Sequence, residues 1–437
     1  MPDAAHAATA QKQVSPALFE HILNVARRLA SSSDLQEVLG LIIDTLRDTL
    51  QADRAGVFQY DPGTHELIAT RVHGLPPTLR LPADKGIIGE AARSKKIVNI
   101  PDAYSDPRFN QSVDKATGYR TRCLLTIPML DFEGQLVGVA QLLNKDPGVG
   151  GVFTHEDESI AGHLADQAAV ALKRASLLEA RRVKEKLEAD LDVARKIQMA
   201  ALPDAMPKIA GYDVAGHFQP ADQTAGDAYD VIDLRTMPAR QGGEDALLFM
   251  ADATGHGIGP ALSVAQVLAM VRMGCRVGSS VADIAVHANE QLVCDLPAGR
   301  FVTAFLGALD SRNHTLSYVS AGQAPLLFIK GDHVGGYVSA NSNAMPLGID
   351  PDFRFEPVEP FRFEPGDMFL LLSDGYYEAM DATNEQLGVQ RVVETVQANS
   401  GESAERIVKA IRELLTRFVG GRPAADDQTA VVVKRTA

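Results

Sequence analysis

Glu179-Ala-Arg-Arg-Val-Lys-Glu-Lys-Leu-Glu-Ala-Asp-Leu-Asp192 is the charged centre of a longer stretch, residues 158–202, which has no proline and almost no glycine. Apolar or small residues recur three or four positions apart from Leu164 to Leu178 and again from Val183 to Ala194, with a slip of heptad phase between the two series. The pattern predicts one helix of about 45 residues, roughly 65 Å long. Its Glu-, Lys- and Arg-rich faces favour a two-stranded coiled coil, and a solvated single helix is the alternative. Pro203 ends the helix, because the residue before a proline is pushed out of the α region.

The length and composition of the chain bound the number and the kind of its domains. With 437 residues the chain exceeds a single core, so we expect two or three domains. A hydrophobic fraction of 46% and a charged fraction of 22% are typical of a soluble globular protein. No apolar run approaches the roughly 18 residues of a membrane span, and we expect no membrane association. Residues 1–15 lack an apolar signal core, and we expect a disordered lead-in there.

The charge and the cysteines exclude two further classes. Against 42 Lys and Arg stand 56 Asp and Glu, and the net charge of −14 argues against a nucleic-acid partner. The three cysteines, Cys123, Cys275 and Cys294, are odd in number and far apart, which excludes a disulfide framework or a thiolate zinc site within one chain. A reducing cytoplasm fits this composition.

The part of the chain before the long helix reads as a small α+β domain. Residues 18–29 and 36–50 have helical period, and Ser33-Asp-Leu-Gln36 has the spacing of a capping box. Short β-type runs follow, separated by turns rich in Gly, Pro and Asp. The runs cover residues 55–60, 67–72, 123–130 and 136–143. Two helices, an antiparallel sheet and a closing helix make such a domain.

Two motifs in this domain carry a resemblance. Residues 99–104 and 106–121 form a loop richer in polar and aromatic side chains than a connection needs. Asn144-Lys145, Phe153 and Asp157-Glu158 then follow with the spacing of a known signature. Here the chain resembles a GAF domain, and more narrowly the cyclic-nucleotide-binding GAF domains of phosphodiesterases and some adenylyl cyclases.

The resemblance implies a cyclic-nucleotide site, with cAMP or cGMP as the regulatory ligand. Its residues are Val72, His73, Ile87, Ile88, Asp114, Thr117 and Thr121. Asp114, Thr117 and Thr121 would lie on a lid, and the two isoleucines would offer backbone groups. A single phosphate charge and a flat base need amides and apolar walls, which agrees with this set. Two alternatives stay open: a domain that binds another small molecule, or one that only dimerises.

Acidic residues stand beside glycine or threonine at the strand ends of the second half. They are Asp227, Asp252, Asp374 and Asp426, close to predicted strands at 228–234, 247–250, 368–372 and 430–434. A single Asp at such a place is usually a turn residue. Several carboxylates that converge from different elements are instead what two Mg²⁺ or Mn²⁺ ions require. Many antiparallel strands with helical pairs between them predict two stacked sheets covered by helices.

At this point the chain resembles the PPM family of metal-dependent protein phosphatases, in the SpoIIE-like branch that controls bacterial sigma factors. The matching motifs are Gly226-Asp227, Asp252 with Gly255-His-Gly257, Ser320-Ala-Gly322 with Pro325, Pro346-Leu-Gly348, Ser373-Asp-Gly375 and Asp426-Asp-Gln-Thr429. The end of the long helix, with Gln198 and Leu202, is similar to the switch helix that precedes this domain. The family's usual Gly-Gly-Asp is Ala225-Gly226-Asp227 here.

The resemblance implies a two-metal site that hydrolyses phosphoserine or phosphothreonine through an activated water, without a phosphoenzyme. Asp227 and Asp252 would bridge or flank two Mn²⁺ or Mg²⁺ ions, with the Ala253 carbonyl as a further ligand. Asp374 and Asp426 would complete the second metal. His256 either donates a proton to the leaving oxygen or is structural.

The sequence therefore predicts a cytoplasmic sensor phosphatase, dimeric through its linker helix, whose substrate is a phosphorylated anti-sigma-factor antagonist. We expect a lead-in at 1–15, a GAF domain at 16–157, a coiled-coil linker at 158–203 and a PPM-type αββα sandwich at 204–437. The rival is a nucleotide-gated scaffold whose phosphatase fold is inactive and only docks a partner. The complete set of four Asp residues favours the enzyme, because a scaffold has no need of it.

Overall fold

A computed structural model describes residues 16–32, 34–72, 79–237, 239, 243–331, 337–340, 342–356 and 358–436. The expected lead-in at 1–15 and the expected ligand residue His73 lie outside these residues. Internal contacts divide the chain into two units, Met1–Lys186 and Leu187–Ala437. The three cysteines are free, as the sequence predicted.

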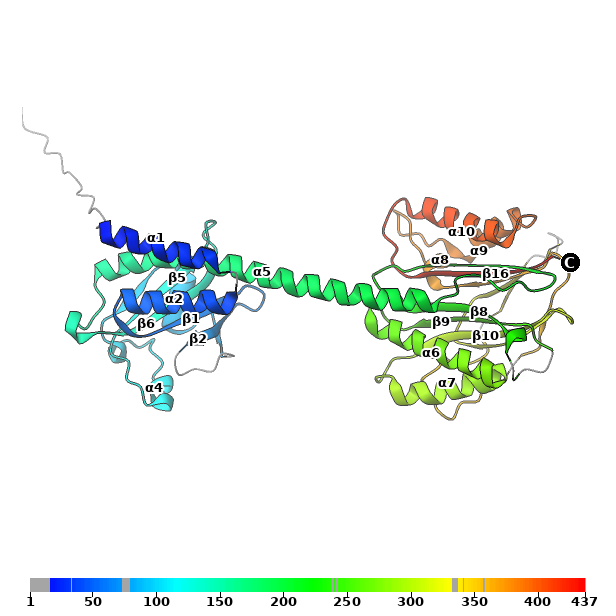
Figure 1. Ribbon diagram of the computed structural model, residues 1–437, viewed down its shortest axis with the longest axis horizontal. Helices are drawn as coiled ribbons and strands as arrows, with labels where there is room; N and C mark the ends of the chain where they lie inside the picture. The colour runs from blue at the N-terminus through cyan, green and yellow to red at the C-terminus, as the bar shows by residue number, and fades with distance from the viewer. Residues whose placement is uncertain are drawn as a thin grey trace, which may run out of the picture. The chain divides into compact units, whose positions relative to one another are not determined.

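The N-terminal unit is built on one antiparallel sheet with the strand order β3-β2-β1-β6-β5-β4 (Figure 1). The strands are β1 (Ala52–Asp61), β2 (Glu66–Val72), β3 (Arg80–Pro82), β4 (Val98–Ile100), β5 (Leu124–Leu130) and β6 (Leu136–Lys145). The helices are α1 (Pro16–Ser31), α2 (Leu35–Thr49), α3 (Gly86–Ser94), α4 (Ser112–Thr117) and the start of α5 (His155–Ala201). The main core of this unit joins α1, α2 and α5 to strands β1, β5 and β6.

Helix α5 begins three residues before the predicted start and has 47 residues. Thr154 and Asp157 begin it, since the Thr154 amide donates to the Asp157 carboxylate and the Asp157 amide donates to the Thr154 hydroxyl. Leu164 and Leu172 are buried in the sheet core, whereas later apolar positions are exposed, with 54% of Leu187 accessible to solvent. The helix is thus buried at its start and exposed in its middle, and Gln198 near its end is buried again.

The C-terminal unit is an αββα sandwich, which confirms the expected fold class (Figure 1). One sheet has the order β14-β11-β10-β9-β8 and is covered by α6 and α7; the other has the order β13-β12-β15-β16-β7 and is covered by α8, α9 and α10. The strands are β7 (Tyr212–Gln219), β8 (Asp227–Asp233), β9 (Ala246–Ala253), β10 (Val302–Asp310), β11 (Thr315–Ala321), β12 (Leu326–Ile329), β13 (Tyr337–Ala340), β14 (Phe361–Arg362), β15 (Met368–Leu372) and β16 (Gln428–Arg435). The helices are α6 (Ile258–Val277), α7 (Val281–Asp295), α8 (Asp374–Tyr377), α9 (Gly388–Ala398) and α10 (Ala404–Val419).

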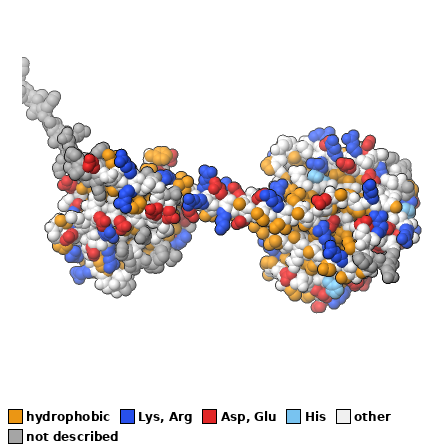
Figure 2. All heavy atoms as spheres, in the orientation of Figure 1, with side chains coloured by type: hydrophobic (Ala, Val, Ile, Leu, Met, Phe, Trp, Pro, Cys, Tyr) orange, Lys and Arg blue, Asp and Glu red, His pale blue; other side chains and the backbone are white. Residues whose placement is uncertain are grey.

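Helix α6 departs from the sequence expectation, because it is long and apolar enough to cross a membrane by length and composition. Val264, Leu268 and Val271 on one of its faces are buried in the core beside β8 and β9. Leu262 and Met273 on another face are exposed, and hydrophobic side chains gather there in Figure 2. The mean hydropathy of α6 is high because one face is buried against the sheet and its exposed face is also apolar.

Candidate active site

Strands β8 and β9 bring the first two predicted carboxylates together. The antiparallel register places Asp227 directly opposite Asp252, although 25 residues separate them in the sequence. The Asp227 side chain is buried, and Asp252 lines a pocket of about 580 Å³. The sequence predicted two carboxylates near one sheet edge, and the register explains why they meet.

Gly226 allows this close approach. A Cβ atom built on it would lie 3.0 Å from the Ala253 carbonyl oxygen and 3.5 Å from an Asp252 carboxylate oxygen. The Ala253 amide in turn donates to the Gly226 carbonyl at 3.0 Å. A side chain at this position would crowd the Ala253 carbonyl, one of the predicted metal ligands, which accounts for the glycine before Asp227.

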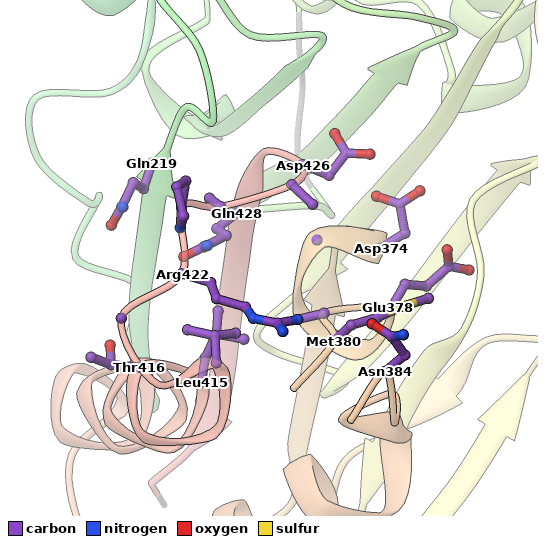
Figure 3. Close-up of a pocket in the computed structure, with 17 residues that line it drawn as sticks. Gln219, Asp374, Glu378, Met380, Asn384, Leu415, Thr416, Arg422, Asp426 and Gln428 are labelled. Atoms are coloured by element: carbon purple, nitrogen blue, oxygen red, sulfur yellow. The ribbon is translucent and has the colours of Figure 1, made fainter. Parts of the chain in front are cut away.

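Asp374 and Asp426 reach the same pocket from the second sheet. Asp374 begins α8 directly after β15, and Asp426 precedes β16. Both line the 580 Å³ pocket together with Asp252, and both also line an adjoining pocket of about 560 Å³. Figure 3 shows the Asp374, Asp426 and Glu378 carboxylates on the same side of that second pocket, away from Thr416 and Leu415. The two sheets therefore contribute two predicted carboxylates each.

Burial, and then repulsion between neighbouring carboxylates, raises the pKa of three of these groups. Burial, followed by the Asp252 charge, raises the pKa of Asp227 well above its usual value. Burial, followed by the charges of Asp374 and Asp426, raises the pKa of Asp252 to about 7. Burial and the Asp426 charge raise the pKa of Asp374 to about 6. Holding all of them ionised at neutral pH requires positive charge nearby.

The donor set suits hard divalent cations, which take oxygen ligands from Asp and from backbone carbonyls. Within the described residues, no three His, Cys, Asp or Glu side chains already lie close enough together to hold an ion. The carboxylates line a pocket instead of a tight cage. The residues fit the predicted metals in chemistry and burial, and their roles as ligands stay a prediction.

Three residues that sequence reasoning did not assign hold this set in place. The Thr429 hydroxyl donates to the Asp227 carboxylate. The Ser373 hydroxyl donates to the Asp427 carbonyl at 2.9 Å and accepts from the Thr429 amide at 2.9 Å. The Asp427 carboxylate accepts two backbone amides. The partners of Asp427 and Thr429 lie about 200 residues earlier in the chain, so no local sequence signal marked these contacts.

Gly375 lies in α8, and His256 lies in the glycine turn before α6. A Cβ atom on Gly375 would lie 2.0 Å from the Asp427 carbonyl oxygen, so only glycine fits there. His256 is exposed on the pocket wall between Gly255 and Gly257, which have φ of 94° and 93°. The left-handed glycines set the direction of this turn, and the role of His256 stays a prediction.

The last turns of α5 contact the same site. Gln198 is buried, its amide nitrogen donates to the Ala225 carbonyl at 2.7 Å, and its amide oxygen accepts from the Ala225 amide at 3.0 Å. Arg272 of α6 donates to the Ala201 carbonyl at 2.7 Å, and Leu202 is buried in the core. The helix end is thus bonded to the residue two positions before Asp227.

In the N-terminal unit, the structure pairs two of the predicted ligand residues with each other. The Asp114 carboxylate is buried and accepts from the Thr121 amide at 2.7 Å and from the Thr121 hydroxyl at 2.9 Å. The Tyr104 hydroxyl donates to the same carboxylate at 3.1 Å. The Tyr104 ring also packs on Phe109, and the Arg120 guanidinium lies over it. These contacts close the predicted lid segment on itself.

The other predicted ligand residues lie apart from that pair. The exposed Thr117 hydroxyl donates to its own helix, at the Val113 carbonyl. Ile87 is buried in a cluster with Ile100 and Leu124, whereas Ile88 and Val72 pack against a different cluster around Phe58. Val72, Ile87 and Ile88 therefore contribute apolar side chains to two different clusters, on two sides of α3.

The signature residues of the same unit form a buried network. Lys145 and Asp157 make an ion pair at 2.5 Å, and both are buried. Asn144 has a positive φ of 55°, and its side chain accepts from the Arg122 amide and donates to the Arg120 carbonyl and the Tyr119 hydroxyl. The network ties the lid segment to β6, and β6 to the start of α5.

The structure thus shows two kinds of domain, a sheet with helices on both faces and an αββα sandwich with a carboxylate-lined pocket. Residues 34–172 match the sequence profile of the GAF domain, and residues 242–436 match the profile of "Stage II sporulation protein E (SpoIIE)". The chain therefore carries a GAF domain and a SpoIIE-type protein serine/threonine phosphatase domain, which confirms the resemblance to each of these two domain families.

Individual relatives cover one domain each. The chain is 33% identical over 175 residues to "Dual 3',5'-cyclic-AMP and -GMP phosphodiesterase 11A" of Takifugu rubripes. The matched region covers 37% of this chain and 19% of that protein. The chain therefore spans about a fifth of the length of this curated relative. The solved SiaA-PP2C domain of Pseudomonas aeruginosa is 21% identical, with a TM-score of 0.48, and covers 58% of this chain and 99% of its own. A GAF domain from a Coxiella burnetii phosphoenolpyruvate-protein phosphotransferase is 22% identical, with a TM-score of 0.34, and covers 37% and 96%.

Proposed function

We propose that this protein is a cytoplasmic, Mn²⁺- or Mg²⁺-dependent phosphatase that removes phosphate from serine or threonine of a partner protein under control of its GAF domain. The observation that carries the proposal is the convergence of Asp227, Asp252, Asp374 and Asp426 on one site in a SpoIIE-type domain. By the resemblance, the partner is a phosphorylated anti-sigma-factor antagonist.

The chain's own residues give the site its charge and shape. Divalent cations, when bound, supply Lewis acidity toward water and the phosphoryl oxygens. Asp227 and Asp252 would hold them from the first sheet, with the Ala253 carbonyl beside them, and Asp374 and Asp426 would hold them from the second. The open pocket next to Asp252 leaves room for a phosphorylated side chain.

Phosphate release from a phosphoserine protein by the purified full chain tests this activity. We expect release with Mn²⁺, and none after the metal is removed with EDTA. A chain that binds a phosphorylated partner but releases no phosphate with either metal would establish the rival scaffold.

The regulatory ligand in the proposal is cAMP or cGMP. The support is the match with a protein named as a dual cyclic-AMP and cyclic-GMP phosphodiesterase, together with the lid built around Asp114 and Thr121. Calorimetry on the full chain should give saturable binding of one nucleotide. Absence of heat with both nucleotides at millimolar concentration would reject this ligand class.

Regulation passes, in this proposal, along α5 to Gln198. A ligand can shift an equilibrium only by its differential affinity for two states, so we expect coupling of about 1–3 kcal/mol, or roughly 5- to 150-fold in activity. Four residues inserted after Lys186 rotate the downstream helix by roughly 40°, whereas seven nearly restore the phase. We expect the first insertion to uncouple nucleotide from activity and the second to keep the response. Unchanged regulation in both would make α5 a passive tether.

We further propose that two copies pair through α5. The support is a series of exposed apolar side chains at Val183, Leu187 and Ile197, where 60%, 54% and 67% of each residue is accessible. Sedimentation should give a dimer for the unmodified chain and a monomer for Leu187→Glu, because a charge in a paired seam is costly. A monomeric unmodified chain would contradict the pairing.

A further inference from the structure

Asp427 is a buried carboxylate that binds two separate backbone segments of the phosphatase domain. One oxygen accepts from the Ala221 amide at 2.8 Å and the other accepts from the Gly226 amide at 2.6 Å. Its own amide donates to the Asp426 carboxylate at 2.8 Å. No single turn explains this arrangement, because Ala221 and Gly226 lie more than 200 residues before Asp427 in the sequence.

The turn that carries Asp227 is held at three consecutive residues by three different groups. Gln198 of α5 binds Ala225, Asp427 binds Gly226, and the Thr429 hydroxyl binds Asp227. Two of these groups belong to the segment that also supplies Asp426. The position of Asp227 relative to Asp426 is therefore set largely through Asp427.

We infer that Asp427 is a positioning residue that sets the spacing of the Asp227 and Asp426 carboxylates and thereby the affinity of the site for divalent cations. This inference rests on the proposed function. It also assigns Asp427 a part in regulation, since the α5 side chain Gln198 and Asp427 act on neighbouring residues of one turn. Removing the contact of either Gln198 or Asp427 should therefore weaken the effect of the other on the position of this turn.

The test is calorimetric Mn²⁺ binding to the full chain, with phosphate release measured beside it. Asp427→Asn places an amide NH₂ or a single acceptor where two backbone amides need acceptors, so we expect the Mn²⁺ dissociation constant to rise about 10- to 100-fold. Activity at saturating Mn²⁺ should recover most of its original value.

Asp367→Asn is the matched control. Asp367 is also a buried carboxylate that accepts two backbone amides, from Gly331 and Glu364, and it also forms an ion pair with Lys330 at 2.9 Å. It lies between β14 and β15 and outside the pocket lining. Because Asp367→Asn also breaks this ion pair, we expect a loss of thermal stability at least as large, with a Mn²⁺ constant changed less than about twofold. An equal Mn²⁺ constant in both variants would overturn the inference.

A double-mutant cycle separates a positioning residue from a direct ligand. If Asp427 acts through the shared turn, Gln198→Ala should change Mn²⁺ affinity less in the Asp427→Asn background than in the unmodified chain. Additive effects would overturn the inference. Should Asp427→Asn fail to fold, Thr429→Val removes another hold on the same turn, and an unchanged Mn²⁺ constant there would have the same force.

The unmodified chain distinguishes the two levels of the argument. If it binds neither Mn²⁺ nor Mg²⁺, the proposed function itself fails. If it binds Mn²⁺ and the Asp427→Asn variant binds equally well, the proposed function stands and only the role of Asp427 is wrong.

Discussion

Buried acidic side chains have opposite surroundings in the lid segment of the GAF domain and in the carboxylate site of the phosphatase domain. Asp114 accepts three hydrogen bonds from Thr121 and Tyr104, so its charge is satisfied within the protein. Asp252 instead lies near other carboxylates, which raise its pKa to about 7 after burial. The Asp114 carboxylate is satisfied by contacts within the protein, whereas Asp252 faces further carboxylates, which is the difference expected between a closed segment and a proposed metal site.

Removing one carboxylate from the metal site should give the largest effect. Asp374→Asn keeps the shape of the side chain and removes its charge, so we expect Mn²⁺-dependent phosphate release to fall about 1,000-fold or more, equivalent to about 4 kcal/mol. Asp352→Asn, on an exposed loop of the same domain, removes a charge far from the pocket and should leave the rate unchanged. Full activity of Asp374→Asn would sink the metal assignment.

The buried ion pair of the GAF domain offers the next largest effect, because its two charges satisfy each other. Lys145→Met leaves Asp157 buried and unpaired, which should cost about 3–5 kcal/mol of unfolding free energy in chemical denaturation. The double variant Lys145→Met/Asp157→Leu should recover much of the loss. Arg181→Met, which breaks an exposed pair with Glu185, should cost less than about 0.5 kcal/mol.

The same pair predicts an acid dependence of stability. Burial raises the pKa of Asp157, but hydrogen bonds from Lys145 and Thr154 outweigh it, and the pKa lies below the usual value. Its contribution to stability is therefore present above the unfolded pKa of about 3.9 and is lost as the pH falls through the folded value. Between pH 5 and pH 3, the free energy of unfolding measured by denaturation should fall more steeply for the unmodified chain than for Lys145→Met/Asp157→Leu. Parallel curves would contradict this.

The smallest effect belongs to the lid. Thr121→Ala removes a hydroxyl bonded to buried Asp114 and should weaken nucleotide binding or lid stability by about 1 kcal/mol. Thr117→Ala, whose exposed hydroxyl bonds only its own helix, should change either quantity by less than half of that. Equal effects of the two variants would mean that the lid contacts do not matter for the ligand.

The elements with a clear period were predictable from the sequence. Helix α5 was expected at 158–202 and spans His155–Ala201, and strands such as β8 and β15 fall within a residue of their predicted limits. Strands β3 and β14 were missed, because two or three residues are too few for an alternation to show. The helix cap at Asp34 lies one residue after the predicted Ser33, since a capping side chain is chosen by local geometry that several polar neighbours can satisfy.

The acidic motifs of the phosphatase site were also predictable, because Asp beside glycine at a strand end is visible in the chain. The residues that hold these motifs in place were not predictable from the sequence. The partners of Asp427 and Thr429 lie about 200 residues away, at the start of β8 in the other sheet, and no local pattern encodes how the two sheets pack. The pairing of Asp114 with Thr121 was within reach of the sequence, because only seven residues separate them.

Gly375 bears on how tolerant each codon of this gene should be to replacement. A Cβ atom at this position would lie 2.0 Å from the Asp427 carbonyl oxygen. Gly375 is next to the predicted metal ligand Asp374, and Asp427 is next to the predicted ligand Asp426. In a library that randomises single codons, position 375 should therefore tolerate as few amino acids as the acidic positions, although glycine brings no functional group. Intolerance in such a scan would mark, at this position, the space that the site needs and not the chemistry that it performs.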